Sequence, residues 1–513
     1  MSDGIFMGGG GPDYGTPQHL LYEFANRHGL IAGATGTGKT VTLQIMAEEL
    51  SAAGVPVVLA DVKGDLSGLA VPGSADFRLH DAFTERAGKI GLDGYAYGAA
   101  PVTFWDLFGK AGHPVRTTVA EMGPLLLSRL LDLSEAQEGI LNIAFRLADD
   151  EGLPLLDLAD LRAMLIWVGE NRSRLSLRYG NVATSSVGAI QRRLLVLEQQ
   201  GGDHLFGEPA LDLADLMAVT PDGRGRVNIL AADRLMANPR LYATFLLWLM
   251  SELFEELPEV GNPEKPHLVF FFDEAHLLFD DAPKALVDKV EQVARLIRSK
   301  GVGVFFVTQN PTDIPEDVLG QLGNRVQHAL RAFTAKDRRA LKDAADTYRS
   351  NPRFDTADAI RDVGVGEAVT SFLQRKGVPG VVERTLIRPP SSRLGPLSDA
   401  ERRDLIAASP LAGKYDARLD RVSAFEKLQA RAQAAASAAE TAETGAMDAP
   451  LAEREFNTAR RYSGTRVGRS SAHSTRSRES FGTAISTAVI KELKGTTGRR
   501  IVRGLVGTLF KGR

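Results

Sequence analysis

The chain has 513 residues, of which 44% are apolar and 24% charged, a composition typical of globular proteins with one large or several smaller folding units. It contains no cysteine, which excludes disulfides, thiolate metal sites and cysteine nucleophiles. The formal charge is −3, but residues 453–513 carry 14 Lys and Arg against 4 acids. That segment is therefore +10 and the remainder −13.

The glycine-rich segment 1–15 has neither a basic start nor an apolar stretch, so we expect no signal peptide there. A helix that spans a membrane needs about 20 consecutive apolar residues. The best candidate, Leu241–Met250, is shorter and soon meets acidic residues. We therefore expect a soluble, cytoplasmic protein.

The first part of the chain alternates between strand and helix patterns. Apolar runs that are typical of buried strands occupy 29–33, 55–60 and 102–105. Apolar residues at helical spacing predict an amphipathic helix over 40–53. The stretch 114–216 has helical spacing and no convincing strand. We interpret 1–110 as the first part of an α/β core and 111–225 as a helical insertion.

The α/β pattern resumes afterwards, and we assign 226–395 as the second part of the core. Further buried strands are predicted at 227–231, 268–272 and 302–307, with helices at 239–257 and 283–300. A hairpin is predicted from strands 367–373 and 381–387 around the turn 376–380. Arg388, Pro389 and Pro390 end the regular structure, because proline removes backbone donors.

The composition changes after residue 395. We interpret 396–455 as an alanine-rich helical linker, with its helix over 419–444. Residues 456–513 form a basic tail, which we expect to be disordered at 457–479 and amphipathic at 484–510. The charge of this tail fits two alternatives equally well. It either binds an anionic partner, such as nucleic acid, a membrane surface or the acidic body, or it is simply solvated.

Residues 33–40 match the Walker A pattern G-x-x-x-x-G-K-[ST], between a predicted strand and a predicted helix. The glycines let successive N–H groups point at phosphate oxygens, and the helix N-terminus adds partial positive charge. Lys39 is expected to reach the β- and γ-phosphates of ATP, and the Thr40 hydroxyl to bind Mg²⁺. The ATP-binding residues that we predict are Gly33, Ala34, Thr35, Gly36, Thr37, Gly38, Lys39, Thr40 and Val41.

Two adjacent carboxylates follow the apolar run 268–272, as in a Walker B strand. We expect Asp273 to hold Mg²⁺ and Glu274 to take a proton from the water that attacks the γ-phosphate. The neighbouring His276 is ambiguous, and we do not predict a catalytic role for it. The sequence therefore predicts a magnesium-dependent ATPase.

Gln309 follows the next predicted strand, where its amide can hydrogen-bond the γ-phosphate and the attacking water. Arg298 lies eleven residues earlier and is either a functional residue or a solvated arginine.

Together these residues resemble the HerA–FtsK superfamily of ring-forming DNA motors, and in particular the bacterial HerA-like ATPases of the YjgR type. The resemblance runs from about residue 20 to 395. It rests on 26–44, 61–66, 273–276 and 307–315.

This resemblance implies a RecA-like sheet, with the acidic strand between the P-loop strand and the others, and a hexamer with ATP between subunits. It also implies an arginine finger that reaches the neighbouring subunit's γ-phosphate. Arg298 matches the finger by position, and Arg325 is the reserve candidate. The chain departs from the archaeal motors, which carry an N-terminal barrel domain, because only about 25 residues precede the P-loop strand.

Two functions remain in consideration. The first is an ATP-driven motor on DNA, with basic residues of the insertion as pore candidates: Arg172, Arg174, Arg178, Arg192 and Arg193. The second is an ATP-dependent switch or assembly factor that acts on a protein partner or a membrane surface through its tail. The segment that begins at Arg388, after the last predicted strand, either contacts the adenine base or simply ends the regular structure.

Overall fold

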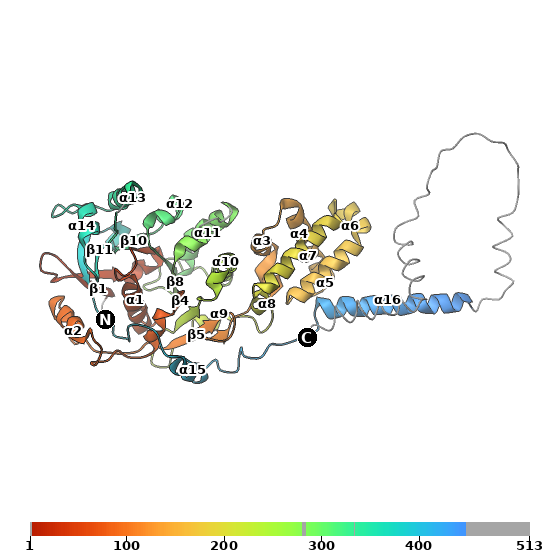
Figure 1. Cartoon of the computed structure of the whole chain (residues 1–513), viewed down its shortest axis with the longest axis horizontal. Helices are drawn as coiled ribbons and strands as arrows, with labels where there is room; N and C mark the ends of the chain where they lie inside the picture. The colour runs from red at the N-terminus through yellow and green to blue at the C-terminus, as the bar shows by residue number, and fades with distance from the viewer. Residues whose placement is uncertain (1–2, 280–283, 333, 448–513) are drawn as a thin grey trace. The chain divides into compact units, whose positions relative to one another are not determined.

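The computed structural model describes residues 3–279, 284–332 and 334–447 (Figure 1). The chain divides into two compact units, Met1–Ala435 and Ala436–Arg513. The described part of the second unit is the end of one long helix. The predicted basic tail, with its amphipathic segment 484–510, lies outside the described residues, as does the end of the predicted linker.

The strands of the first unit, in chain order, are β1 (Gly4–Gly10), β2 (Thr16–Leu21), β3 (Gly29–Ala32), β4 (Val57–Asp61), β5 (Val102–Asp106), β6 (His113–Pro114), β7 (Val227–Ala231), β8 (Leu268–Phe272), β9 (Val302–Thr308), β10 (Asn324–Gln327), β11 (Glu367–Ser371), β12 (Leu373–Gln374), β13 (Val378–Pro379) and β14 (Glu383–Ile387). Twelve of them form one sheet in the order β2-β1-β14-β11-β10-β3-β9-β8-β4-β7-β5-β6. From β10 to β6 all neighbours are parallel. The four strands on the other side are antiparallel to their neighbours.

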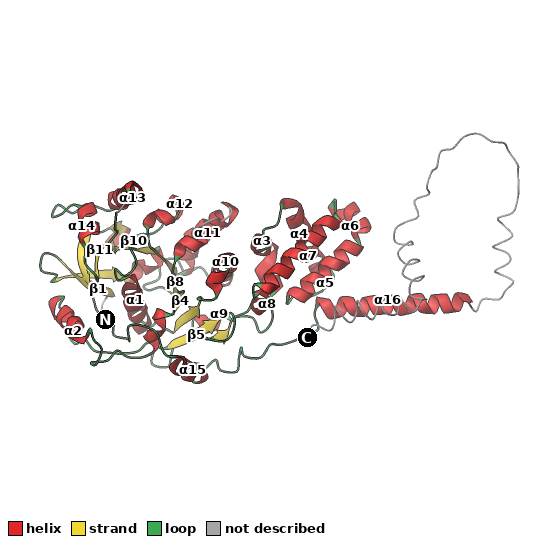
Figure 2. Cartoon of the chain, in the orientation of Figure 1, coloured by secondary structure: helices red, strands yellow, loops and turns green. Residues whose placement is uncertain are grey.

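The helices are α1 (Lys39–Ala52), α2 (His80–Lys89), α3 (Val119–Leu130), α4 (Glu135–Asp150), α5 (Leu158–Glu170), α6 (Arg172–Tyr179), α7 (Thr184–Gln199), α8 (Gly202–Leu205), α9 (Leu213–Leu216), α10 (Pro239–Glu256), α11 (Lys284–Ile297), α12 (Glu316–Leu319), α13 (Ala335–Asp346), α14 (Thr356–Asp362), α15 (Asp399–Ala407) and α16 (Ala424–Met447). Their distribution separates a mixed α/β body from a purely helical lobe, which Figure 2 shows by colour. The fold is therefore α/β, with a large and mostly parallel sheet.

Helices cover both faces of the parallel strands, which explains why β8 is a continuous apolar run and why β4, β7 and β9 are mostly apolar. Alternate side chains of β8 point to opposite faces. Phe271 packs in the core on the α1 side with Leu43, whereas Phe270 and Phe272 pack in the core of α10 and α11. Helix α10 begins at Pro239, and the Asn238 side chain accepts a hydrogen bond from the Leu241 N–H group.

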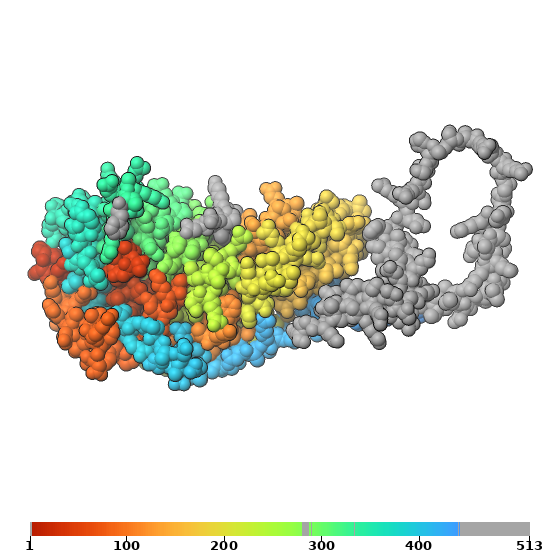
Figure 3. All heavy atoms as spheres, in the orientation of Figure 1, coloured from red at the N-terminus to blue at the C-terminus, as the bar shows by residue number. Residues whose placement is uncertain are grey.

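Seven helices, α3 to α9, lie between β6 and β7. The space-filling view shows α4 to α7, coloured yellow, as a continuous lobe of the first unit (Figure 3). The prediction that 114–216 is helical is confirmed, except that Pro114 belongs to the two-residue strand β6. The alanine-rich helix is also confirmed, as α16.

One expectation about the sheet is wrong. The acidic strand β8 does not follow the P-loop strand β3 directly, because β9 lies between them and pairs in parallel with both. The local apolar pattern of a strand does not determine its neighbours. The consequence for the site is direct, since the residue after β9 is placed between the ends of β3 and β8.

The glycine-rich N-terminus forms the strands β1 and β2, which the sequence did not predict. Glycine is required where β1 meets β14, because a Cβ atom on Gly8 would lie 2.0 Å from the Leu386 carbonyl oxygen. Among the described helices, none is long and apolar enough to cross a membrane.

Candidate functional site

The P-loop connects the end of β3 to the start of α1, as predicted. Its backbone makes a tight curl, with φ of +152° at Gly33, +78° at Gly36 and +118° at Gly38. These values favour glycine, since side chains rarely adopt them. At Gly33 the space is also closed, because a Cβ atom would lie 2.5 Å from the Cβ atom of His328.

Neighbouring strands hold this loop in shape. The Gly33 N–H group donates to the Thr308 carbonyl at 3.3 Å, at the end of β9. Ala34 donates to Ala329 at 2.8 Å, just after β10. On the antiparallel side, Gly366 donates to the carbonyl of Thr37 at 3.2 Å. The loop is thus braced from both sides of β3.

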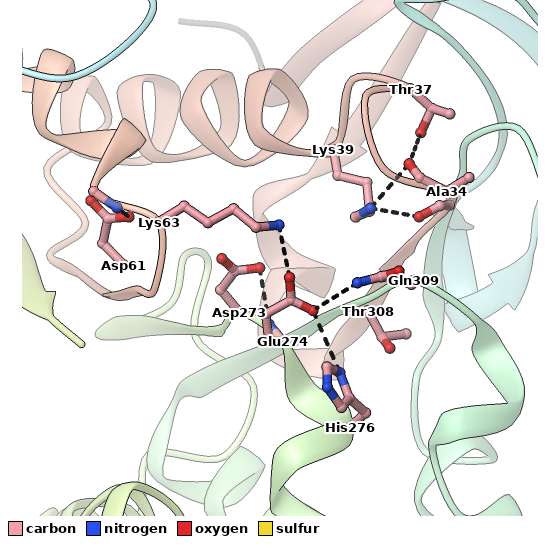
Figure 4. Close-up of polar contacts among 12 residues, drawn as sticks. Ala34, Thr37, Lys39, Asp61, Lys63, Asp273, Glu274, His276, Thr308 and Gln309 are labelled. Atoms are coloured by element: carbon pink, nitrogen blue, oxygen red, sulfur yellow. Dashed lines mark hydrogen bonds and ion pairs between the residues drawn. The ribbon is translucent and has the colours of Figure 1, made fainter. Parts of the chain in front are cut away.

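Lys39 begins α1 and points back over the loop. Its Nζ atom donates to the carbonyl oxygens of Gly33 at 2.5 Å and Ala34 at 3.2 Å, and Figure 4 shows both contacts. Burial and the positive charge of Lys63 lower the pKa of Lys39, while Glu274 and Asp273 act in the opposite direction. An anionic ligand in the loop would therefore find a partly buried ammonium group and oriented N–H groups.

The acidic pair lies at the end of β8, beside the P-loop. Burial and the charge of Glu274 raise the pKa of Asp273 to about 6. Its Oδ1 atom accepts a hydrogen bond of 2.9 Å from the Glu274 N–H group, and its carbonyl accepts one of 3.1 Å from the Tyr242 hydroxyl. Glu274 adopts φ of +48° and ψ of +50°, an uncommon conformation for a non-glycine residue. Such backbone strain is typical of functional sites.

The Glu274 carboxylate contacts three polar side chains. Its Oε1 atom lies 2.7 Å from Lys63 Nζ, and its Oε2 atom lies 3.5 Å from both His276 Nδ1 and Gln309 Nε2. Burial alone would raise the pKa of Glu274, but the hydrogen bond and charge of Lys63 hold it below its usual value. Glu274 is therefore an anion at neutral pH although its residue is only 7% exposed.

Gln309 follows β9 and reaches the acidic pair from the P-loop side, as Figure 4 shows. The turn after it is fixed by Asp313, which accepts hydrogen bonds from the Thr308 hydroxyl at 2.8 Å and the Asn310 N–H group at 3.1 Å. The structure therefore brings Lys39, Glu274 and Gln309 to one edge of the sheet.

The predicted magnesium ligands fit the chemistry of that ion. Thr40 lies in the first turn of α1 and Asp273 at the end of β8, and both supply the oxygen atoms that Mg²⁺ prefers. Within the described ranges, no group of three or more His, Asp or Glu side chains could hold a metal ion. A magnesium ion bound here would therefore share its coordination between these two residues and the nucleotide's phosphates.

The two finger candidates lie away from this edge. Arg298 precedes β9, whereas Gln309 follows it, so a seven-residue strand of roughly 20 Å separates them. Its Nη2 atom donates to Asn262 Oδ1 at 3.4 Å. Arg325 lies on β10, and its guanidinium donates to the carbonyls of Leu322 and Leu319, both at 3.2 Å. In the part of the chain that the structure describes, neither arginine forms a hydrogen bond with the P-loop.

Among the remaining arginines that the sequence singled out, Arg388 and Arg193 form ion pairs within the chain. Arg388 pairs with Glu49 of α1 at 2.5 Å, and its side chain is only 8% exposed. This exit segment thus packs against α1, where Glu48 also accepts a hydrogen bond of 2.9 Å from the Ser391 N–H group. The pore candidates lie on α6 and α7 of the helical lobe, and Arg193 there pairs with Asp132 at 3.0 Å.

Two site residues had no predicted role. Lys63 stood in a quoted motif, but no pattern in the sequence linked it to Glu274. His328 is a lone histidine in a short strand region, which carries no recognisable signal. The roles of both residues can be recognised only from the strand order, which brings distant segments of the chain together.

The chain is similar to known proteins in sequence and in fold. A family model described as Helicase HerA-like C-terminal matches residues 10–513. A curated relative, the DNA double-strand break repair helicase HerA of Sulfolobus acidocaldarius, is 25% identical over 170 residues, or 32% of this chain and 33% of the relative. The match thus spans about a third of that relative's length.

Among solved structures, the unbound monoclinic form of the bacterial conjugative coupling protein TrwBdeltaN70 has a TM-score of 0.46 and 15% identity, covering 77% of this chain and 92% of that one. VirB4 of Thermoanaerobacter pseudethanolicus has a TM-score of 0.46 and 14% identity, covering 75% and 97%. The family match extends over nearly the whole sequence. The chain therefore belongs to the helicase HerA-like C-terminal family.

Proposed function

We propose that the chain is a magnesium-dependent ATP hydrolase of the HerA type that works as a ring of identical subunits, a hexamer, on DNA. One observation carries the hydrolysis proposal. The P-loop with Lys39, the Asp273–Glu274 pair and Gln309 converge at the carboxyl edge of three neighbouring strands. This is the arrangement that transfer of a γ-phosphoryl group to water needs.

Each group has a role in that reaction. The P-loop N–H groups and Lys39 hold the phosphates, while Thr40 and Asp273 hold Mg²⁺. Glu274 accepts a proton from the attacking water as the new oxygen–phosphorus bond forms and the bond to the β–γ bridging oxygen breaks. Gln309, whose amide lies 3.5 Å from Glu274, orients that water. Because its pKa lies below its usual value, Glu274 is ionised at neutral pH, the state that a proton acceptor needs.

The ring and the DNA track are supported by family membership and by the position of Arg298. That arginine lies across the sheet from its own P-loop, so it can act on a nucleotide only if the nucleotide belongs to a neighbouring subunit. The curated relative is named as a helicase of DNA double-strand break repair, which makes DNA the first track to test.

The test measures the ATPase rate of the full chain with single- and double-stranded DNA over a series of salt concentrations, and its mass in each nucleotide state. We expect DNA to stimulate hydrolysis most at low salt, because phosphate contacts release counterions. We also expect ATP to favour a hexamer. An ATPase rate that DNA does not change at any salt concentration would contradict a motor acting on DNA. It would favour a protein or membrane partner.

A further inference from the structure

The turn at residues 61–65, which begins with the last residue of β4, has no part in the roles above, yet hydrogen bonds fix its conformation. Asp61 is only 1% exposed, and its two carboxylate oxygens accept hydrogen bonds from the N–H groups of Gly64 at 2.7 Å and Leu66 at 3.2 Å. The turn needs a positive φ of +74° at Gly64. Asp61 thus fixes the backbone from which Lys63 extends.

Lys63 crosses from this turn to the acidic pair. Strands β4 and β8 are direct neighbours, so the segments that follow them share one edge of the sheet. Lys63 Nζ lies 2.7 Å from Glu274 Oε1, as Figure 4 shows. The lysine side chain is 46% exposed and the glutamate side chain 9%. The ammonium group therefore reaches in from solvent to a nearly buried carboxylate.

This contact occupies the group that hydrolysis requires. A carboxylate oxygen that accepts a hydrogen bond from an ammonium group at 2.7 Å is less able to take a proton from water. Lys39 stands at the same edge, and the positive charges of the two lysines repel each other. Two ammonium groups and two carboxylates thus lie together where a γ-phosphate would add further negative charge.

We propose that Lys63 is a positioning residue that detects the γ-phosphate. In the chain without nucleotide it holds Glu274. When ATP binds, Lys63 donates instead to a γ-phosphate oxygen, which frees Glu274 Oε1 to accept the proton of the attacking water. ADP carries no γ-phosphate and leaves the Lys63–Glu274 pair in place. This inference rests on the proposed ATPase function, since it assigns Glu274 as the proton acceptor.

The experiment compares the affinities of the full chain for ADP and for a non-hydrolysable ATP analogue, both with Mg²⁺. In Lys63→Met we expect the preference for the analogue over ADP to fall about tenfold or more, the effect of losing one charge-assisted hydrogen bond. ADP affinity should stay within about twofold of the wild type. Lys63→Arg, which keeps a cationic donor, should retain most of the preference.

Lys336→Met on α13 is the matched control, because it removes an exposed lysine elsewhere on the chain. A purely structural role for Lys63 would weaken ADP and the analogue alike, and that result would overturn the proposal. An unchanged preference in Lys63→Met would overturn it as well.

The two proposals fail in different ways. If the wild type does not hydrolyse ATP, or if Glu274→Gln hydrolyses it at the wild-type rate, the proposed function fails. If hydrolysis is real and depends on Glu274, but Lys63→Met keeps its preference for the analogue, only the role of Lys63 fails.

Discussion

The Nε2 atom of His328 lies 2.8 Å from the Thr42 hydroxyl, behind the P-loop. The other ring nitrogen, Nδ1, lies 2.9 Å from the Glu367 carbonyl oxygen, which can only accept. Nδ1 therefore carries a proton. Since burial lowers the pKa of His328 well below neutral pH, the imidazole is neutral and Nε2 accepts from the Thr42 hydroxyl. Because the His328 Cβ position also limits residue 33 to glycine, this histidine helps to set the shape of the loop.

His328→Leu should destabilise the protein and weaken nucleotide binding. The substitution leaves the Thr42 hydroxyl and the Glu367 carbonyl without partners in a buried place, which costs about 1–3 kcal/mol for each group. Thermal or denaturant unfolding measures the first effect, and titration with ADP the second. The exposed His267 gives the control variant His267→Leu, which should resemble the wild type. Equal stability of the two variants would contradict the role of His328.

Stability should also depend on pH through this residue. Burial, assisted by the charge of Lys39, lowers the pKa of His328 to about 4, against about 6.5 in the unfolded chain. As pH falls from 6.5 to 4, the unfolded chain binds a proton that the folded chain does not, so the free energy of unfolding decreases. At pH 5 the loss relative to pH 7 should be about 2 kcal/mol.

The comparison with His328→Gln isolates this effect, because both proteins share every other titrating group. The free energy of unfolding of the wild type should fall between pH 7 and pH 5, and that of the variant should fall less. The difference between the two free energies of unfolding should therefore become smaller as the pH falls. A difference that stays constant or widens would show that His328 is protonated in the folded chain.

The ion pair between Arg388 and Glu49 should contribute measurably to stability. Arg388 is nearly buried, so Arg388→Met leaves Glu49 without its partner and should reduce the free energy of unfolding by about 2–4 kcal/mol. Adding Glu49→Gln should restore part of the loss. The exposed pair Arg361–Asp358 is the control, and Arg361→Met should reduce the free energy of unfolding much less than Arg388→Met. Similar losses for both arginines would contradict this expectation.

The sequence predicted the central strands well because their burial on two faces leaves an unmistakable pattern. The run at β8 is apolar throughout and that at β7 is apolar except for Asn228, and the predicted bounds of both strands coincide with the observed ones. Strand β10 was missed because its buried Asn324 looks like a loop residue. Its amide donates to the carbonyls of Phe24 and His28, partners that the sequence cannot connect to it.

The candidate site also has a part that the sequence predicts and a part that it does not. The P-loop, the acidic pair and Gln309 each follow a recognisable strand, and the structure brings them together. The pairing of Lys63 with Glu274 and of His328 with Thr42 depends on strand order, which no local pattern encodes. The adjacency of β4 to β8 and of β10 to β3 is therefore the information that the local sequence patterns do not contain.

Arg298 should act between subunits. Because it cannot reach its own P-loop, Arg298→Ala should reduce the ATPase rate by about a thousandfold or more, and Lys39→Ala should abolish nucleotide binding. When the two inactive variants are mixed and allowed to exchange subunits, an intact Arg298 can meet an intact P-loop. The mixture should then hydrolyse ATP well above the sum of its components. A mixture that stays inactive after verified subunit exchange would contradict action in trans.

The most direct test of the central claim compares ATP binding and hydrolysis in the wild type and in Glu274→Gln. Glu264→Gln, an exposed substitution before β8, is the control. If Glu274 is the proton acceptor, Glu274→Gln binds ATP with Mg²⁺ about as well as the wild type while its hydrolysis falls by at least a hundredfold. Glu264→Gln should keep both properties. Undiminished hydrolysis in Glu274→Gln would contradict the account.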